Sequence, residues 1–265
     1  MQDKKHIATD PLVSVIIPCH SCHSTIRRTL QSVIQQTYKN IEIICVIDGI
    51  DRKLHNVIRS IAYEKLQIVI HDRNMGVGVA RNTGIENSSG TYIAFLDADD
   101  DWSDTKLEQQ ISFMQRMNAS ISCCQVTYGS FSQENNFHKK YEKIPRKIYS
   151  KAHIPSLLIE NKIITSSVVA KRKIFDIHKF KPIRNRQDLI LWCEILSSGT
   201  SIFALQVPLT RYDLSTNGIS ANKLKMINAN YRAYRIITHS AVASFLFVAL
   251  SLMKRVLLEA GRRVR

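Results

Sequence analysis

Four carboxylates stand close together after a short apolar segment. The apolar run 92–96 is followed by four aspartates within five positions: Asp97, Asp99, Asp100 and Asp101. Such a run predicts a buried strand, and open α/β sheets bind their ligands at the carboxyl ends of their strands. Carboxylates this close repel one another unless a cation lies among them. Oxygen ligands suit Mg²⁺ or Mn²⁺, which usually bridge a protein carboxylate to a substrate phosphate. The pattern therefore predicts a divalent-metal site, with a solvated acidic turn as the alternative.

The elements that would position these carboxylates are strands and helices in alternation. Apolar runs predict buried strands at 12–18, 41–47, 68–70 and 92–96. Helices are expected between them at 24–36, with Ser24 as the N-cap, and at 54–63 and 76–86. This alternation predicts parallel β-α-β units with right-handed crossovers, so one edge of the sheet would collect the polar strand ends.

The second half of the chain is less regular. Helices are expected at 106–117 and 188–196, the second with Leu189, Trp192 and Cys193 facing inward, and strands at 121–128 and 163–169. The segment 129–146 is polar and basic and is expected to be a loop. From Asn222 the pattern is helical to the end. The length of 265 residues allows one large α/β domain with an appendage, or two small domains.

The charge is high and uneven. The formal net charge is +15, and residues 221–265 hold nine Lys/Arg against one acid, Glu259. The apolar segment 241–253 would span roughly 20 Å as a helix, too short for the ~30 Å of a bilayer. Followed by basic residues, it suits a helix lying on an anionic membrane surface, or else a core helix that closes the domain. The start of the chain, 1–11, is polar and indicates no signal peptide, so the six cysteines are expected to be reduced.

Six short motifs occur in an order that resembles the family 2 glycosyltransferases with the GT-A fold. They are residues 13–18, 30–33 with 36–38, Asp48-Gly49, 74–76, 80–84 and 95–100. The resemblance is dense over 12–118 and looser over 150–220. It implies an α/β fold with a single Rossmann-like, mostly parallel central sheet flanked by helices, followed by a C-terminal helical extension.

The resemblance also implies a nucleotide-sugar donor, usually linked to UDP, and Mn²⁺ or Mg²⁺. The donor-binding residues it indicates are Pro18, His20, Asp48, Asn74, Gly76, Arg81, Asp97, Ala98 and Asp99. Asp48 can accept a hydrogen bond from a pyrimidine ring. Arg81 can bind a phosphate near the N-terminus of a helix, with a surface salt bridge as the alternative. Asp99 matches the direct metal ligand, and Asp97 matches the aspartate that reaches the ribose or the metal.

An inverting transferase needs a general base for the acceptor hydroxyl. The family carries a Glu-Asp pair at the start of a helix, and the matching residues here are Gln187 and Asp188. Asp188 is therefore the candidate base, with a helix N-cap as the alternative. Trp192 is expected to pack in the core rather than stack on a sugar. The chain also departs from the family at Ile47, where an aspartate is usual, and at His20-Ser21, where Tyr-Asn is usual.

The stretches 207–212 and 217–223 resemble a subset that builds bacterial surface polysaccharides such as O-antigen and capsule. That resemblance implies a polyprenyl-diphosphate-linked sugar acceptor and a cytoplasmic, peripheral position on the inner membrane. UDP-glucose and UDP-galactose are the favoured donors. The expected division is a tail (1–11), a donor-binding half (12–118), an acceptor-binding half (119–220) and a basic, apolar extension (221–265). The alternatives are an inactive scaffold subunit, a nucleotidyltransferase, or a nucleic-acid-binding protein, which no recognised motif supports.

Overall fold

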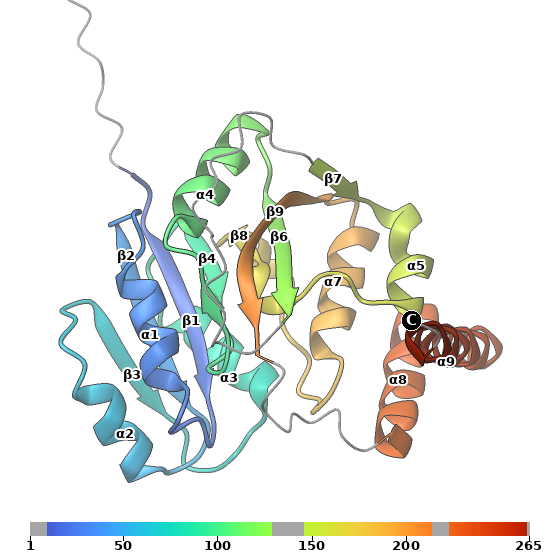
Figure 1. The fold of residues 1–265 in the computed structure, drawn as a ribbon, viewed down its shortest axis with the longest axis horizontal. Helices are drawn as coiled ribbons and strands as arrows, with labels where there is room; N and C mark the ends of the chain where they lie inside the picture. Colours follow the sequence, from blue (N-terminus) through green and yellow to red (C-terminus); the bar gives the residue numbers. More distant parts are fainter. Residues whose placement is uncertain (1–9, 129–145, 214–222, 264–265) are drawn as a thin grey trace, which may run out of the picture.

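The structure is a computed structural model, and it describes residues 10–128, 146–213 and 223–263. The expected loop at 129–146, the 217–223 motif and the 1–11 tail lie almost entirely outside the described residues. Strands and helices alternate along the first half, as the sequence predicts (Figure 1). The strands are β1 Val13–Cys19, β2 Ile41–Ile47, β3 Leu66–Ile70, β4 Tyr92–Phe95, β5 Asp101–Trp102, β6 Ile121–Tyr128, β7 Arg146–Tyr149, β8 Val169–Lys171 and β9 Ile202–Tyr212.

These strands form one sheet within the described residues, in the order β3-β2-β1-β4-β8-β6-β9-β5, and β7 also pairs with β9. The first four are parallel, with Val13 opposite both Ile41 and Tyr92. The second half is mixed, because β8 runs antiparallel to both β4 and β6. The expectation of a single central α/β sheet is confirmed. The parallel arrangement holds for the half that carries the strand-end aspartates.

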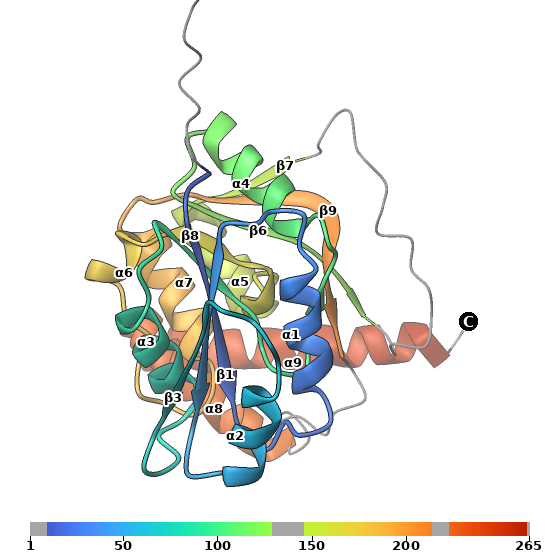
Figure 2. The same cartoon turned by 90° about the vertical axis from the view of Figure 1, so that its left-hand side faces the viewer.

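Helices cover both faces of the sheet, with α1, α2 and α4 on one face and α3, α6 and α7 on the other (Figure 2). They are α1 Ile26–Ile34, α2 Arg52–Arg59, α3 Val77–Glu86, α4 Lys106–Arg116, α5 Ile154–Ile159, α6 Ile174–Ile177, α7 Gln187–Ser197, α8 Lys223–Thr238 and α9 Ala241–Arg263. Alternate residues of β1 enter the two cores, Val15 on the α1 side and Ile16 on the α3 side. At Gly84 an added Cβ would lie 2.3 Å from Ile16 Cγ2, so this glycine lets α3 approach the sheet.

Several expected element boundaries are wrong, among them the end of the helix expected at 54–63, because α2 ends at Arg59. Helix α1 begins at Ile26 with Thr25 as the N-cap, and no side chain caps it, so Ser24 is not the N-cap. The segment 163–169 is not a strand: a 3₁₀ turn, Thr165–Ser167, precedes the short strand β8. Ser167 Oγ donates locally to the backbone oxygen of Ile164 at 2.6 Å, and Ser166 Oγ donates to Asp100 Oδ2, which is 66 positions away in the sequence. These bonds compete with strand pairing.

The C-terminal region is helical, as expected, but it is broken into α8 and α9. His239 adopts a φ of 55°, and Ser240 Oγ accepts from the backbone N–H of Ala243 at 3.3 Å to start α9. Helix α9 lies crosswise to β1 in Figure 2 and packs against α5 and α8. Among the described residues, no helix is long and apolar enough to cross a membrane.

Candidate active site

A hollow opens at the carboxyl ends of β1 and β2. Its volume is about 360 Å³, counting the part open to solvent. It is lined by Cys19, His20, Ser21, Ile47, Asp48, Gly49, Ile50, Asp51, Leu54 and Asn74. His20 Nδ1 lies 3.1 Å from the backbone oxygen of Asp48, and Asn74 Nδ2 lies 3.2 Å from His20 Nε2. Three residues expected to bind the donor therefore lie together, and Pro18 is buried in the strand that leads to them.

The carboxylate of Asp48 is buried and holds the loop before α3. Its Oδ1 accepts from the backbone N–H of Met75 and its Oδ2 from that of Gly76, both at 2.8 Å. His71 Nδ1 lies 2.9 Å from Oδ1. Burial alone would raise the pKa of Asp48, but the hydrogen bonds from His71, Met75 and Gly76 outweigh burial and lower that pKa. Since both oxygens are used within the protein, Asp48 positions this loop, and its direct contact with a base stays a prediction.

Helix α3 brings a glycine and an arginine to the same edge. Gly76 has a φ of 94°, which favours glycine, and apart from its two chain neighbours no atom of the described residues lies within 4 Å of where its Cβ would stand. Arg81 is only 3% exposed, and its Nη2 donates to Asp97 Oδ1 at 2.5 Å, so it is not a surface salt bridge. Its Nε and Nη1 are buried without a partner among the described residues. Such groups are costly to leave unpaired, and phosphate oxygens would satisfy them.

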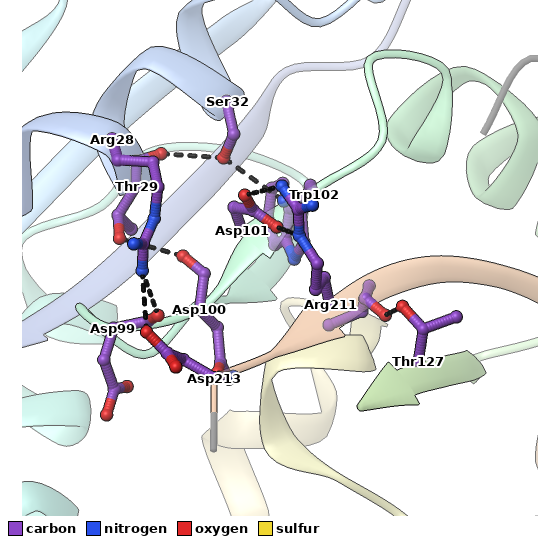
Figure 3. A network of polar contacts seen from close by, with 11 residues as sticks. Arg28, Thr29, Ser32, Asp99, Asp100, Asp101, Trp102, Thr127, Arg211 and Asp213 are labelled. Atoms are coloured by element: carbon purple, nitrogen blue, oxygen red, sulfur yellow. Dashed lines mark hydrogen bonds and ion pairs between the residues drawn. The ribbon is translucent and has the colours of Figure 1, made fainter. Parts of the chain in front are cut away.

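The four clustered aspartates have separate environments, and Figure 3 shows three of them, Asp99, Asp100 and Asp101. Asp97 pairs with Arg81, and Asp101 accepts two hydrogen bonds from Arg211, at 3.0 Å from Nε and 2.6 Å from Nη2. Asp100 is fully buried and accepts from Ser166 Oγ at 2.5 Å and from the backbone N–H of Asp213 at 3.2 Å. The Asp99 side chain is partly exposed and points away from this network (Figure 3).

One polar face of α1 holds the turn that carries these aspartates. Thr29 Oγ1 donates to the backbone oxygens of Ala98 and Asp100, at 3.0 and 2.8 Å. Seven residues further on and just past the end of the helix, Gln36 Nε2 donates to the backbone oxygen of Ser103 at 2.6 Å. Ala98, which is expected near the donor, is buried, and its backbone oxygen accepts the hydrogen bond from Thr29 of α1. These hydrogen bonds hold the backbone of the turn from within the protein.

Asp97 and Asp99 are the carboxylates suited to a divalent metal. Asp97 is 30% exposed at its side chain, whereas Asp100 and Asp101 are buried. Within the part of the chain that the structure describes, no three His, Cys, Asp or Glu side chains are arranged to hold a metal ion. Mg²⁺ usually takes only one or two carboxylates from a protein and its other ligands from water and phosphates. The donor set therefore fits an ion that binds together with a diphosphate.

Asp100 should make stability depend on pH. Burial, with the nearby charges of Asp97 and Asp99, raises the pKa of Asp100 to about 8. Its carboxyl has an ordinary pKa of about 3.9 in the unfolded chain. The folded protein therefore holds a proton that the unfolded chain has lost, and the free energy of unfolding falls as pH rises from about 4 to about 8.

We expect the free energy of unfolding of the metal-free protein to fall by on the order of 1–3 kcal/mol between pH 6 and pH 8, because Asp100 is protonated only in the folded state over this range. Each pKa unit corresponds to ~1.4 kcal/mol, and the range allows for the titration of Asp100 being coupled to that of Asp97 and Asp99. Asp100→Asn, which keeps the shape of the protonated acid, should remove this loss. Urea unfolding at both pH values measures it. An equal pH slope in wild type and variant would contradict the assignment.

Asp188 lies in the first turn of α7, beside Asn161. Asn161 Nδ2 donates to Asp188 Oδ2 at 3.3 Å, and Asp188 is partly exposed. The N-cap is Arg186, in a left-handed conformation with φ 64°, so the alternative of Asp188 as the N-cap is excluded. Leu189, Cys193 and Trp192 face the core as expected, and Trp192 is fully buried against Phe180.

Helix α3 packs directly on the start of α7. An added Cβ at Gly78 would lie 3.0 Å from Gln187 Cγ and 2.9 Å from the backbone oxygen of Lys181. Asn82 exchanges two hydrogen bonds with the backbone of Phe180, at 2.9 and 3.1 Å. The residue before Asp188 is thus packed against the helix that carries Arg81, so the candidate base and the candidate phosphate-binding arginine lie on two helices in direct contact.

Sequence reasoning missed the residues that support the carboxylates. Ser166, Arg211 and Asp213 come from segments distant in the sequence, and their roles depend on β9 pairing with β5. A signal for α1 was present, because Thr29, Ser32 and Gln36 are polar residues at helical spacing beside the apolar face. The six cysteines are all free and buried, as expected for reduced thiols.

The comparison with known families agrees with this geometry. The profile of the family described as "Glycosyl transferase family 2" matches residues 14–176. This chain belongs to that family. The family membership expected from the six motifs is confirmed.

Relatives span most of the chain. TuaG of Bacillus subtilis, a glycosyltransferase assigned to teichuronic acid biosynthesis, is 32% identical over 246 residues, which cover 90% of this chain and 94% of TuaG. WfgD of Escherichia coli, named as a UDP-Glc:alpha-D-GlcNAc-diphosphoundecaprenol beta-1,3-glucosyltransferase, is 31% identical over 84% of this chain and 85% of its own.

The fold also matches solved structures. TarS 1–349 of S. aureus in complex with UDP-GlcNAc superposes with a TM-score of 0.69 at 15% identity, covering 91% of this chain and 71% of that one. At this identity the likeness concerns the fold alone, and it confirms the expected GT-A architecture of this family 2 glycosyltransferase.

Proposed function

We propose that this glycosyltransferase moves a hexose, with inversion, from a UDP-sugar to a sugar on a polyprenyl diphosphate, in the synthesis of a bacterial surface polysaccharide. The observation that carries the proposal is the packing of α3 on α7, where Gly78 lies against Gln187. Arg81, paired with Asp97, lies on α3, and Asp188 follows Gln187 on α7. WfgD and WfaP, both 31% identical to this chain, are named for UDP-Glc and a diphosphoundecaprenol acceptor. UDP-glucose is therefore the favoured donor, ahead of UDP-galactose.

In this mechanism each residue has one task. Asp188 takes the proton of the acceptor hydroxyl while the hydroxyl oxygen bonds to the anomeric carbon of the donor. The bond from that carbon to the UDP oxygen breaks, and UDP leaves with the electron pair. Arg81 binds a phosphate of the donor with its unpaired N–H groups. Asp97 and Asp99 would hold Mn²⁺ or Mg²⁺, which when bound neutralises charge on the departing diphosphate.

A donor panel tests the proposal. The purified protein is incubated with Mn²⁺ or Mg²⁺, each common UDP-sugar, and N-acetylglucosamine linked by diphosphate to a short alkyl chain. UDP release and product mass are recorded. Transfer from one UDP-sugar that stops with EDTA is the expected result. If no donor releases UDP and UDP binding is independent of metal, the reaction is wrong and an inactive scaffold role is favoured.

Helix α9 supports peripheral contact with an anionic membrane. Its solvent-facing stripe is apolar over several turns, with exposed side chains at Val242, Phe245, Leu246, Met253, Val256 and Leu257. Basic residues follow it in the sequence. An apolar helix face next to basic residues binds the interface of anionic lipids without crossing it.

We expect the double substitution F245S/L246S to reduce cosedimentation with phosphatidylglycerol vesicles at least tenfold, because both side chains are more than half exposed on the stripe. Ile177 is 81% exposed on α6, and Ile177→Ser is the matched control, which should bind like wild type. Equal binding by all three proteins would show that α9 does not contact the membrane.

A further inference from the structure

A second cavity lies beside Asp188, between α5, α7, α8 and α9. Its volume is about 740 Å³, counting the part open to solvent. It is lined by Leu157, Leu158, Ile159, Glu160, Asn161, Arg186, Leu189, Asn230, Tyr234, Ser251 and Lys254. Asn161 lines the cavity and also donates to the carboxylate of Asp188. Arg186, which also lines the cavity, is the N-cap of α7, the helix that carries Asp188. The cavity therefore borders the candidate base from the side of the C-terminal helices.

The charged residues of this cavity favour an anion. Lys254 Nζ lies 2.6 Å from Glu160 Oε2, and Lys162 Nζ lies 3.2 Å from the same oxygen, so two lysines share one carboxylate. The hydrogen bond from Lys254 is the main cause of the lowered pKa of Glu160. Arg186 Nε donates to Asn230 Oδ1 at 2.7 Å. Its two terminal nitrogens have no partner among the described residues, which leaves its forked donors available to a phosphate.

Helix α9 contributes both to the wall of this cavity and to the exposed apolar stripe described above. Ser251 and Lys254 of α9 line the cavity, whereas Met253 and Val256 of α9 are exposed on the apolar stripe. A lipid with a charged, sugar-bearing head would meet both surfaces at once, with its chain at the stripe and its head in the cavity.

We propose that this cavity binds the diphosphate of the lipid-linked acceptor, with Lys254 and Arg186 as its phosphate-binding residues. The proposal rests on the proposed function and adds the subsite that selects a diphosphate acceptor over a neutral one. Glu160 then acts as a competitor for Lys254, which it must share with the bound diphosphate.

The test uses a pair of charge-removing substitutions with opposite expected effects. Lys254→Gln should weaken binding of N-acetylglucosamine linked by diphosphate to a short alkyl chain about tenfold, whereas Glu160→Gln should leave it equal or tighten it a few-fold. Binding is measured by calorimetry in detergent, without donor, so that the result does not depend on turnover. Neither change should affect binding of the neutral alkyl glycoside of the same sugar, or of UDP.

Three outcomes would overturn the proposal. If both substitutions weaken diphosphate binding and lower the melting temperature alike, the ion pair is only structural. If Lys254→Gln weakens binding of the neutral glycoside as much as binding of the diphosphate-linked sugar, the cavity does not recognise phosphate. If it weakens binding to phosphatidylglycerol vesicles but not to the acceptor, the cavity takes a lipid headgroup. Failure of the proposed function is distinct from these, since it appears as wild-type protein that binds the acceptor but releases no UDP from any donor.

Discussion

Replacing Asp99 by alanine should abolish sugar transfer, with a loss of at least a thousandfold in kcat/KM. Asp99 is the partly exposed carboxylate that points away from the polar network around Asp100 and Arg28. If it holds a divalent ion against the donor diphosphate, its loss removes both donor affinity and charge neutralisation in the transition state. Binding of UDP, followed by calorimetry with Mn²⁺ and with EDTA, should weaken in the variant only when metal is present.

The control for this substitution lies two positions along the same turn. Asp101 is buried against Arg211 through two hydrogen bonds, so Asp101→Asn should lower the melting temperature and leave the metal dependence of UDP binding intact. The metal role of Asp99 would be disproved by an Asp99→Ala protein that keeps metal-dependent UDP binding or more than a tenth of the wild-type activity.

Asp188→Asn should lower kcat about 10²- to 10⁴-fold, the range typical for loss of a positioned general base. The donor should still bind, because Arg81 and the hollow at β1 and β2 do not involve Asp188. The measurement is steady-state transfer at saturating donor, together with UDP-sugar affinity. The amide keeps the size of the carboxyl and a hydrogen-bond partner for Asn161.

Asn161→Ala is the matched control for this prediction. It removes the single side-chain bond that Asn161 gives to Asp188 and leaves the carboxylate in place, so kcat should change only a few-fold. Turnover of Asp188→Asn within a few-fold of wild type would mean that another group accepts the proton. An equal loss in both variants would instead indicate that orientation of the helix start matters more than basicity.

The first half of the fold follows from local patterns. The apolar runs before Asp48 and Asp97 end abruptly in polar residues, and parallel strands place such ends on one edge. The hollow with His20, Asp48 and Asn74 forms for this reason. The sequence indicated Arg81 as a phosphate-binding candidate because it follows a glycine-rich helix start. It did not indicate that Arg81 pairs with Asp97.

The rest of the site depends on long-range pairing that no local pattern contains. Asp101 and Trp102 form too short a run to read as a strand, and they become one only because β9 lies alongside. Ser166 donates a hydrogen bond to Asp100 from a 3₁₀ turn within 163–169, a segment whose sequence predicted a strand. Asn161 reaches Asp188 across 27 positions in the sequence. Contacts of this kind are fixed by tertiary packing, which overrides local propensity.

The burial of all six cysteines gives this protein a clean background for chemical labelling. Burial keeps a thiol protonated and out of reach, as the raised pKa of Cys193, about 12, illustrates. A cysteine introduced at Leu246, which is 55% exposed on α9, would then be the reactive one. A fluorophore attached there could follow the approach of α9 to a bilayer during turnover, with every native residue of the catalytic centre left in place.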